Sequence, residues 1–535
     1  MKIQSKIFQS KLRENISRIF GVFDQSVYEE VSTYFHWQEI LAGEWLFHQN
    51  DPGDSLYILI NGRLQVILKN EEGLLSVVGD ISRGETVGEM AIFTGENRSA
   101  SVKAVRDSVL VKLEKDDFER MSIRFPGISA NITRLIIERL KRQNLKQRYA
   151  RRFVSIALLS ISDSIDSVPF IEQLCLSLER RKKRVLLLTP GRINEMLGVD
   201  LFSMDSTHRD HYLDLSAWLD EQEALHDYVL YAADHSESEW TEKCLRHADE
   251  VLLLARAGDP PELSSVEQRY LNSYDGEVMA ERTLILVHPA KMNRTDIPQG
   301  TENWLENRDV HGYRHLKEGE PGEIDRLARF ICGESHGLVL SGGGAKGIAH
   351  LGVYRALEEA DLALDIIGGT SIGAVFGGLI AKGLDAKDVR SVTRKMFLRN
   401  PTPLSDYNIF PMVSLLRGRT LDKMLNEVFR DTKIENLWLE FFCVASDLSK
   451  ICPVVFAQGS LQKAIRSSIS IPAIFPPVVQ GNSLLIDGGV INNFPIDLMA
   501  ERAAGKIIGV FLNQEKEARL NYEKVPGTWD LFVDR

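Results

Sequence analysis

Residues 337–380 have the sequence GLVLSGGGAKGIAHLGVYRALEEADLALDIIGGTSIGAVFGGLI, and this stretch carries the strongest structural signal in the chain. It holds two apolar, strand-like runs, and each is followed by a glycine-containing turn and then by a helical pattern. Alternation of strand and helix is typical of an α/β domain. We therefore predict an α/β domain over residues 333–535, the last domain of a multidomain chain.

The second of these turns is Gly369-Thr370-Ser371-Ile372-Gly373, between the strand-like run LDII and the helical run AVFGGLIAKGL. GxSxG in this context is typical of a nucleophile elbow, a tight turn that small flanking residues permit and that exposes the serine hydroxyl. The bare pattern is common by chance. The strand-turn-helix context is what favours Ser371 as a nucleophile.

The first turn is the glycine cluster Gly342, Gly343 and Gly344, again between an apolar strand and a helix. Consecutive glycines let backbone N–H groups point together at an anion, and the helix N-terminus adds its dipole. Such a loop binds either a phosphate or a tetrahedral oxyanion. The absence of the Lys-Ser/Thr pair of a P-loop counts against a nucleotide.

The choice of general base is limited because no histidine follows Ser371 in the sequence. All twelve histidines precede Ser371, whereas an α/β-hydrolase places its histidine after the serine, so that triad is excluded. Asp487, followed by two glycines after the strand-like run SLLI, is the strongest candidate for a carboxylate that acts directly on the serine. An ordinary aspartate pKa near 3.9 makes a weak base, so we expect burial to raise it. Taken alone, Asp-Gly-Gly is more typical of a β-turn.

Together the three motifs resemble the patatin-like phospholipase family, whose pattern is a GGGx[R/K]G loop, a GxSxG elbow and a DGG dyad partner. The resemblance covers about residues 337–512 and includes the stretches SISIPAIFPP and DGGVINNFP. The proline-containing run Ile471–Val478, within the first of these stretches, is apolar. It fits an acyl-chain pocket or lipid-facing surface, or equally core packing.

The resemblance also implies a reaction. Ser371 attacks an ester carbonyl of a phospholipid or lysophospholipid, and Asp487 takes its proton and later activates water to hydrolyse the acyl-enzyme. Gly342, Gly343 and Gly344 supply the oxyanion N–H groups. No metal and no catalytic cofactor are expected.

Residues 1–152 have a different pattern: short β-rich runs from about Val27 to Leu113, then a helical region. We expect an antiparallel β-roll. Within it, the run VGEMAIF followed by NRSA resembles the phosphate-binding cassette of cyclic-nucleotide-binding domains.

In that scheme Arg98 pairs with the cyclic phosphate, and Glu89 accepts from the ribose 2′-hydroxyl. The Gly88 backbone approaches the ligand closely, and Ser99 adds a hydroxyl. The resemblance implies cAMP or cGMP as an allosteric ligand without choosing between them. The alternative is a β-roll retained only as an interaction surface.

Residues 153–332 alternate apolar strands with amphipathic helices and predict a central Rossmann-like α/β domain without a phosphate loop. The polar segment His311–Gly322 is predicted to be a linker. The order of the three domains resembles the neuropathy target esterase family of lysophospholipases. Members of that family often have an N-terminal anchor and continue past the strand KIIGVFL, so we expect a shorter or truncated relative.

Composition limits the partners. The net charge of −11 disfavours nucleic acid, and five scattered cysteines favour a reducing compartment, so we expect a cytoplasmic location with contact at the membrane periphery. The basic runs Arg134–Arg152 and Arg180–Arg184 could meet an anionic membrane, or could be solvated surface. Two other functions stay open: a catalytically inert, cyclic-nucleotide-responsive lipid-binding scaffold, and a transcription regulator, which the strand VSIALLSI disfavours.

Overall fold

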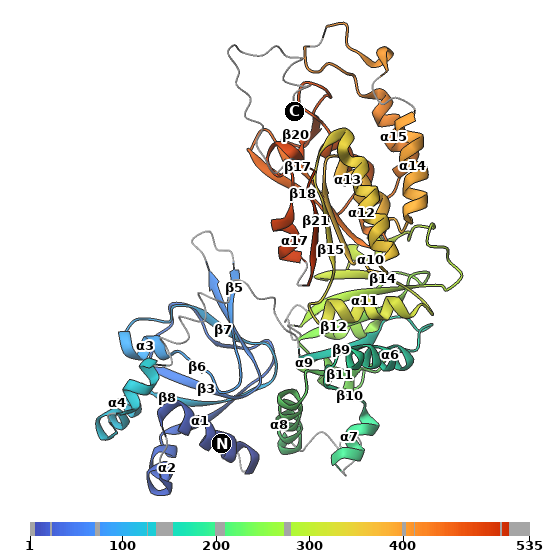
Figure 1. The fold of residues 1–535 in the computed structure, drawn as a ribbon. Coiled ribbons are helices and arrows are strands. Elements are labelled where there is room, and N and C mark those ends of the chain that lie inside the picture. The colour runs from blue at the N-terminus through green and yellow to red at the C-terminus, as the bar shows by residue number, and fades with distance from the viewer. Residues whose placement is uncertain are drawn as a thin grey trace. The chain divides into compact units, whose positions relative to one another are not determined.

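The computed structural model describes residues 6–21, 24–69, 75–125, 127–134, 154–197, 209–271, 280–398, 403–410, 412–502 and 505–512. They fold into two compact units, Met1–Ser335 and His336–Arg535 (Figure 1). The first unit contains both a β-roll and a central parallel sheet, and the second contains a single larger sheet. None of the helices in the described part of the chain has the length and apolarity that a membrane span requires.

The β-roll consists of two antiparallel four-stranded sheets, in the orders β1-β8-β3-β6 and β2-β7-β4-β5. Its strands are β1 (Phe35–Ile40), β2 (Trp45–Phe47), β3 (Ser55–Asn61), β4 (Leu64–Lys69), β5 (Leu75–Ile81), β6 (Thr86–Val87), β7 (Ser101–Ala104) and β8 (Ser108–Glu114). Its helices are α1 (Lys6–Phe20), α2 (Gln25–Ser32), α3 (Glu89–Thr94) and α4 (Lys115–Arg124). The predicted roll is present.

The predicted start of the β-rich region near Val27 is wrong, because that residue lies in α2. Asp24 caps this helix: its side chain accepts a hydrogen bond from the Val27 N–H at 2.9 Å. An aspartate N-cap satisfies an N-terminal donor that would otherwise have no partner, and this favours helix over strand.

The central domain is a six-stranded parallel sheet in the order β10-β11-β9-β12-β13-β14, as predicted. Its strands are β9 (Ser155–Ser160), β10 (Val185–Leu188), β11 (Tyr228–Ala232), β12 (Glu250–Arg256), β13 (Glu281–His288) and β14 (Gly312–Lys317). Its helices are α6 (Ser167–Arg180), α7 (Pro190–Leu197), α8 (Arg209–Leu225), α9 (Glu239–His247), η1 (Glu267–Leu271), α10 (Thr301–Glu306) and α11 (Pro321–Ile331). Alternate residues of β9 join two separate cores, one on each face of the sheet, as expected where helices cover both faces.

The segment predicted as a linker, His311–Gly322, instead contains β14, which pairs in parallel with β13. β14 is an edge strand, so only one side needs a partner and polar side chains are tolerated there. The guanidinium of Arg314 lies 3.9 Å from the ring centroid of Phe330 on α11, and His315 Nδ1 lies 2.9 Å from His288 Nε2. Tertiary contacts of this kind leave no apolar pattern in the sequence.

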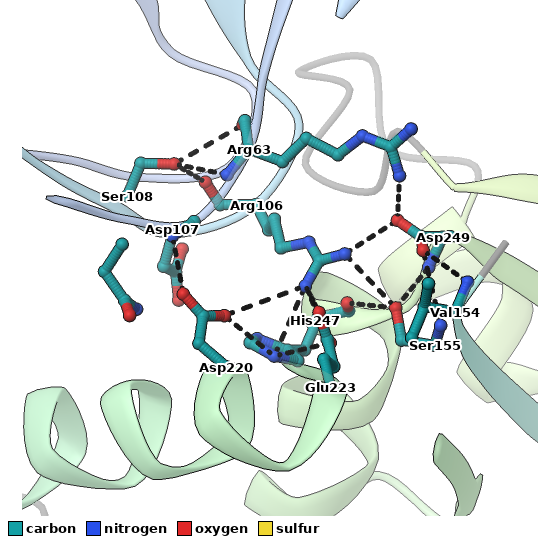
Figure 2. A network of polar contacts seen from close by, with 12 residues as sticks. Arg63, Arg106, Asp107, Ser108, Val154, Ser155, Asp220, Glu223, His247 and Asp249 are labelled. Atoms are coloured by element: carbon teal, nitrogen blue, oxygen red, sulfur yellow. Dashed lines mark hydrogen bonds and ion pairs between the residues drawn. The ribbon is translucent and has the colours of Figure 1, made fainter. Parts of the chain in front are cut away.

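Figure 2 shows a polar network that joins two turns of the β-roll to the central domain within the first unit. Arg63 follows β3 and Arg106 follows β7, and both pair with Asp249, which directly precedes β12. Arg106 also donates to both carboxylate oxygens of Glu223 on α8, at 2.8 Å each. The network is almost fully buried, and it fixes these turns on the central domain.

The buried charges of this network neutralise one another. Burial alone would lower the pKa of Arg106, but the carboxylates of Glu223, Asp249 and Asp220 outweigh it, and the pKa is raised. Conversely, burial would raise the pKa of Asp249, and Arg106 and Arg63 lower it. Both groups stay ionised, and this is what a buried ion pair needs in order to hold two elements together.

The second unit is built on the sheet β19-β20-β17-β16-β15-β21, with β18 paired to β17. Its strands are β15 (Gly337–Leu340), β16 (Ile366–Thr370), β17 (Glu440–Asp447), β18 (Cys452–Phe456), β19 (Val478–Gln480), β20 (Ser483–Asp487) and β21 (Ile507–Val510). Its α-helices are α12 (Ile348–Glu359), α13 (Ile372–Ala381), α14 (Ala386–Leu398), α15 (Arg419–Phe429), α16 (Leu461–Ser468) and α17 (Ile496–Arg502). Short 3₁₀ turns lie at η2 (Gly344–Gly347), η3 (Leu404–Asp406), η4 (Ile434–Asn436) and η5 (Gly488–Val490).

Strand order brings the predicted catalytic elements together. β15, β16, β17 and β21 are mutually parallel neighbours, so the glycine cluster and Ser371 follow adjacent strands at the same edge of the sheet. β20 runs antiparallel to β17, and its last residue, Asp487, pairs with Ala445. The preceding residue of β17, Val444, pairs with Thr370. Residues distant in sequence therefore meet across three adjacent strands.

Candidate active site and nucleotide cassette

Ser371 occupies a strained turn between β16 and α13. Its φ of 54° and ψ of −124° are rarely adopted by a residue with a side chain, and such conformations gather at functional sites. The turn has no room for side chains at its flanks. A Cβ on Gly369 would lie 2.5 Å from the Gly373 carbonyl oxygen, and one on Gly373 would lie 2.1 Å from the Leu340 carbonyl oxygen. The strand-turn-helix prediction for GxSxG is confirmed.

The Ser371 hydroxyl meets the Asp487 carboxylate directly. Ser371 Oγ donates to Asp487 Oδ2 at 2.6 Å, and the two residues are only 7% and 6% exposed. The second carboxylate oxygen, Oδ1, accepts the N–H of Gly489 at 2.7 Å, which fixes the orientation of the carboxylate. The geometry fits a two-residue nucleophile and base, with Oδ2 in reach of the proton to be moved.

The electrostatics of Asp487 suit a base. Burial raises its pKa above the ordinary aspartate value, and the hydrogen bonds from Ser371 and Gly489 only partly oppose this. No described cation forms an ion pair with this carboxylate. The raised pKa of Asp487 agrees with the expectation that burial makes this carboxylate a stronger base.

The glycine cluster lies against the serine, but its three N–H groups are not equivalent. The Gly342 N–H donates to the Asn493 carbonyl at 3.1 Å, so it is not free to bind an oxyanion. The expectation for Gly342 as a donor is therefore corrected: this glycine is needed for space, since a Cβ there would lie 3.2 Å from Ser371 Cβ. Among the described residues, no group accepts from the N–H of Gly343 or Gly344, which leaves both for an anion.

Two further residues hold the site, and the sequence prediction missed them. Ser468 Oγ accepts the Ser371 N–H at 2.9 Å and donates to the Val444 carbonyl at 2.6 Å. Asn493 holds Gly342 through its backbone carbonyl, and its side-chain nitrogen lies 3.4 Å from the Gly342 carbonyl. Ser468 and Asn493 stand inside the stretches SISIPAIFPP and DGGVINNFP, which resemble the patatin-like family, and this position in the sequence was the available signal.

The proline-containing run Ile471–Val478 is partly buried, and its expected contact with an acyl chain or a lipid surface stays a prediction. Phe475 is buried, and Ile471 and Ile474 pack on the same core cluster. Pro472 and Ala473 are exposed. Part of the segment is therefore core packing.

In the β-roll, the cassette residues surround a buried guanidinium. Arg98 is 4% exposed; it donates to the Gly88 carbonyl at 3.1 Å and to Ser55 Oγ at 2.9 Å, and it lies 4.2 Å from the centroid of the Phe47 ring. Its Nε has no hydrogen-bond partner in the described structure. Burial lowers the pKa of Arg98, and nearby acidic groups, including Asp54 at 3.9 Å, do not fully compensate.

The other predicted cassette residues lie beside Arg98. Gly88 has a left-handed φ of 83°, and a Cβ there would lie 2.3 Å from an Arg98 guanidinium nitrogen. Glu89 is buried at the start of α3, whereas Ser99 is exposed. The four residues are thus gathered at one place, with the guanidinium directed into the protein.

A three-residue group with metal-ligating side chains occurs among the described residues: Asp220, Glu223 and His247. The Arg106 guanidinium already contacts it, with its Nη1 2.8 Å from Glu223, 3.9 Å from Asp220 and 3.5 Å from His247 (Figure 2). A cation thus occupies this position already, so we assign the group to the network between the β-roll and the central domain.

Three family models match successive parts of the chain. Residues 37–124 match the cyclic nucleotide-binding domain, residues 152–333 the Neuropathy Target Esterase family P-loop like domain, and residues 338–500 the patatin-like phospholipase. A solved cyclic nucleotide-binding domain from Methylobacillus flagellatus is 21% identical, with a TM-score of 0.25 over 27% of this chain and 86% of that chain.

Similarity to longer proteins extends over nearly the whole chain. Patatin-like phospholipase domain-containing protein 7 of Rattus norvegicus is 30% identical, over 95% of this chain and 40% of that protein. Lysophospholipase nte1 of Neosartorya fischeri is 29% identical, over 93% of this chain and 37% of that protein. The chain thus spans about two fifths of the length of these relatives. The matches to the cyclic nucleotide-binding domain, the Neuropathy Target Esterase family P-loop like domain and the patatin-like phospholipase follow one another along the chain, which is similar to these relatives over nearly its whole length.

Proposed function

We propose that this chain hydrolyses the fatty-acyl ester of lysophospholipids with Ser371 as nucleophile and Asp487 as base. The observation that carries the proposal is the 2.6 Å hydrogen bond from Ser371 Oγ to Asp487 Oδ2, made by a serine in a strained turn. The choice of lipid is supported by the patatin-like domain and by relatives named lysophospholipase.

The first half of the reaction forms an acyl-enzyme. Ser371 Oγ attacks the ester carbonyl carbon while its proton moves to Asp487 Oδ2. The carbonyl oxygen becomes an oxyanion, and the N–H groups of Gly343 and Gly344 are the donors available to it. When the tetrahedral intermediate collapses, the C–O bond to the glycerol breaks, and the leaving alkoxide takes the proton from Asp487.

The second half regenerates the enzyme. Asp487 accepts a proton from water, and the hydroxide attacks the acyl carbon through a second oxyanion. Collapse breaks the bond to Ser371 Oγ, which recovers the proton from Asp487, and the fatty acid leaves. A raised pKa makes Asp487 a better proton acceptor than an ordinary carboxylate, and this suits both halves.

Fatty-acid release from lysophosphatidylcholine tests this function. We expect release by wild type and none above background by Ser371→Ala, with Ser405→Ala, an exposed serine of the same unit, as the matched control. No release by wild type from lysophosphatidylcholine or related lysolipids would instead support an inert lipid-binding scaffold.

We further propose that a cyclic nucleotide binds the cassette and alters catalysis. A buried guanidinium with a lowered pKa, whose ion-pair partner Asp54 is mostly exposed and 3.9 Å away, supports an anionic ligand, because a cyclic phosphate would add a closer counter-charge. Calorimetric titration with cAMP and with cGMP distinguishes the two candidates. Binding of neither nucleotide would leave the β-roll as an interaction surface only.

We also propose that the chain acts in the cytoplasm at the membrane periphery. All five cysteines are free, which suits a reducing compartment. Lipid substrates require at least transient contact with a membrane. Fractionation of cells that express the tagged chain tests this location.

A further inference from the structure

Helix α14 carries a basic face whose cations form no ion pair with any residue in the described part of the chain. Lys387, Arg390, Arg394 and Lys395 are exposed, and their spacing places them along one side of the helix, where they border a shallow groove together with Ser391 and Leu398. We call these four residues the basic stripe. None of them forms an ion pair with another described residue. α14 packs against α12 and α13 on its inner side (Figure 1).

A second feature follows in the sequence. Leu404, Ile409, Phe410, Met412 and Val413 are exposed by 90%, 81%, 81%, 93% and 69%, and we call them the apolar segment. Single exposed apolar residues are ordinary, but five within ten positions are not. An apolar cluster of this kind marks a surface that is covered in the working state.

The backbone of the apolar segment is pinned, so its exposure is a property of the fold. Tyr407 pairs with Leu416 in an antiparallel bridge, and the Asn408 side chain donates to the Ser414 carbonyl at 2.8 Å. Leu416 is buried in the domain core. Inward-facing residues therefore anchor the segment while the apolar side chains between them point to solvent.

The residues that anchor the apolar segment are hydrogen-bonded to backbone close in sequence to residues that contact Ser371 and Asp487. The Leu415 and Leu416 N–H groups donate to the carbonyls of Ala473 and Ile474 at 2.7 and 2.9 Å. A few residues earlier, Ser468 accepts the Ser371 N–H, and the Ser470 carbonyl accepts the Asp487 N–H at 2.8 Å. The apolar segment is thus attached to the same backbone that positions the nucleophile and its base.

The other basic runs differ from the stripe. Arg180 pairs with Asp325 at 2.8 Å, and Arg181 and Lys183 pair with Glu334 at 3.0 and 2.9 Å. These cations are neutralised within the protein, which favours solvated surface for that run. Most of the run Arg134–Arg152 lies outside the described residues.

We propose that the basic stripe and the apolar segment together form the surface by which the catalytic unit docks on an anionic phospholipid membrane. The stripe contacts lipid phosphates and carboxylates, and the apolar segment enters the acyl region, as at membrane-surface helices. The charge argument favours a lipid surface, because four exposed cations gather on one helix in a chain of net charge −11, with no ion-pair partner among the residues that the structure describes. The proposal rests on the proposed lipid hydrolysis and adds the face through which the membrane is met.

Vesicle flotation with the full chain tests the proposal. Wild type is expected to float with vesicles that contain phosphatidylserine and far less with phosphatidylcholine alone. Lys387→Gln with Arg394→Gln should weaken binding about 20- to 30-fold, since each cation near an anionic surface contributes about fivefold. Ile409→Ser with Phe410→Ser should weaken it at least about tenfold. Arg355→Gln and Ile123→Ser, also exposed, are the matched controls and should bind as wild type.

Hydrolysis of the water-soluble ester p-nitrophenyl butyrate separates the two proposals. The docking variants should retain wild-type rates on this ester, which also shows that they are folded. Flotation remains measurable in Ser371→Ala, so a failure of the proposed hydrolysis does not hide the docking result. Equal flotation of variants and wild type would overturn the docking surface. So would variants that lose only self-association in gel filtration, because the surface would then join two protein copies.

Discussion

Arg98 in the nucleotide cassette and Arg106 in the network beside the central domain are both buried arginines of the β-roll, yet their environments are opposite. Arg106 contacts the carboxylates of Glu223 and Asp249, and its pKa is raised. Arg98 donates to a hydroxyl and a carbonyl, and its pKa is lowered. A buried charge that close, buried counter-charges neutralise is structural, whereas one without such a partner is ready for a ligand or a proton; for Arg98 the ion-pair partner, Asp54, lies 3.9 Å away and is 74% exposed.

Asp487 belongs with Arg98 in this comparison. It is a buried carboxylate that meets a neutral serine hydroxyl and a backbone N–H, and its pKa is raised. At Arg98 and at Asp487, burial disfavours the charged form of the side chain, as the direction of each pKa shift shows. Four measurements test whether these buried charges differ in role.

The largest effect is expected at the dyad. Asp487→Asn should reduce fatty-acid release at least about 10³-fold, because the amide cannot accept the Ser371 proton. Asp497→Asn, an aspartate of α17 outside the dyad, is the matched control. Rates for the two variants on lysophosphatidylcholine measure the difference, and similar rates would show that Asp487 is not the base.

The next effect is on stability. Arg106→Gln should lower the free energy of unfolding of the first unit by about 3–5 kcal/mol, because it leaves buried carboxylates unpaired. Arg180→Gln, whose partner pair is partly exposed, should cost about 1 kcal/mol or less. Urea unfolding of both variants gives the comparison. Equal losses would mean that the network does not hold the β-roll on the central domain.

Arg98→Gln should behave in the opposite way. Its cost in stability is expected to be about 1 kcal/mol, because the carboxylate left without its ion pair, Asp54, is 74% exposed and stays hydrated, and the other losses are hydrogen bonds to neutral groups. Calorimetry should show that the variant no longer binds the cyclic nucleotide that wild type binds. A loss of stability as large as that of Arg106→Gln would instead make Arg98 a structural residue.

The smallest effect concerns pH. Because the pKa of Asp487 is raised in the folded chain, the rate should fall as pH falls through that raised value. Above it, the ionised carboxylate disfavours the folded state, so Asp487→Asn should match or slightly exceed wild type in unfolding free energy at pH 8. The difference should vanish in acid, where both side chains are neutral. Thermal unfolding of the two proteins from pH 4 to pH 8 checks the sign.

The motifs predicted which residues meet at the candidate site because these residues stand at strand ends; their catalytic roles stay predictions. Ser371 and Asp487 carry turn signals in their glycines, and the strand order then brings them into contact. The roles of Ser468 and Asn493 could not be predicted, since each depends on which backbone group lies opposite after folding. Gly342 failed as a predicted donor for the same reason.

The network and the docking surface were harder to foresee. Arg63 and Arg106 stand in turns, where charged residues are ordinarily solvated, and only the packing of the roll on the central domain buries them. The basic stripe is visible as a periodic pattern on α14, but the sequence does not show that its cations have no ion-pair partner among the described residues. β14 was mistaken for a linker because an edge strand needs little apolar character.

The most direct test of the account is covalent labelling of the full chain with a fluorophosphonate, followed by mass spectrometry. The reagent phosphonylates an activated serine as fluoride leaves, and it needs the same deprotonation by Asp487 as an ester does. We predict one adduct, on Ser371, formed by wild type and slowed at least about 10³-fold in Asp487→Asn. Labelling of another serine, or equally fast labelling of Ser371 in both proteins, would contradict the assignment of Ser371 and Asp487 as nucleophile and base.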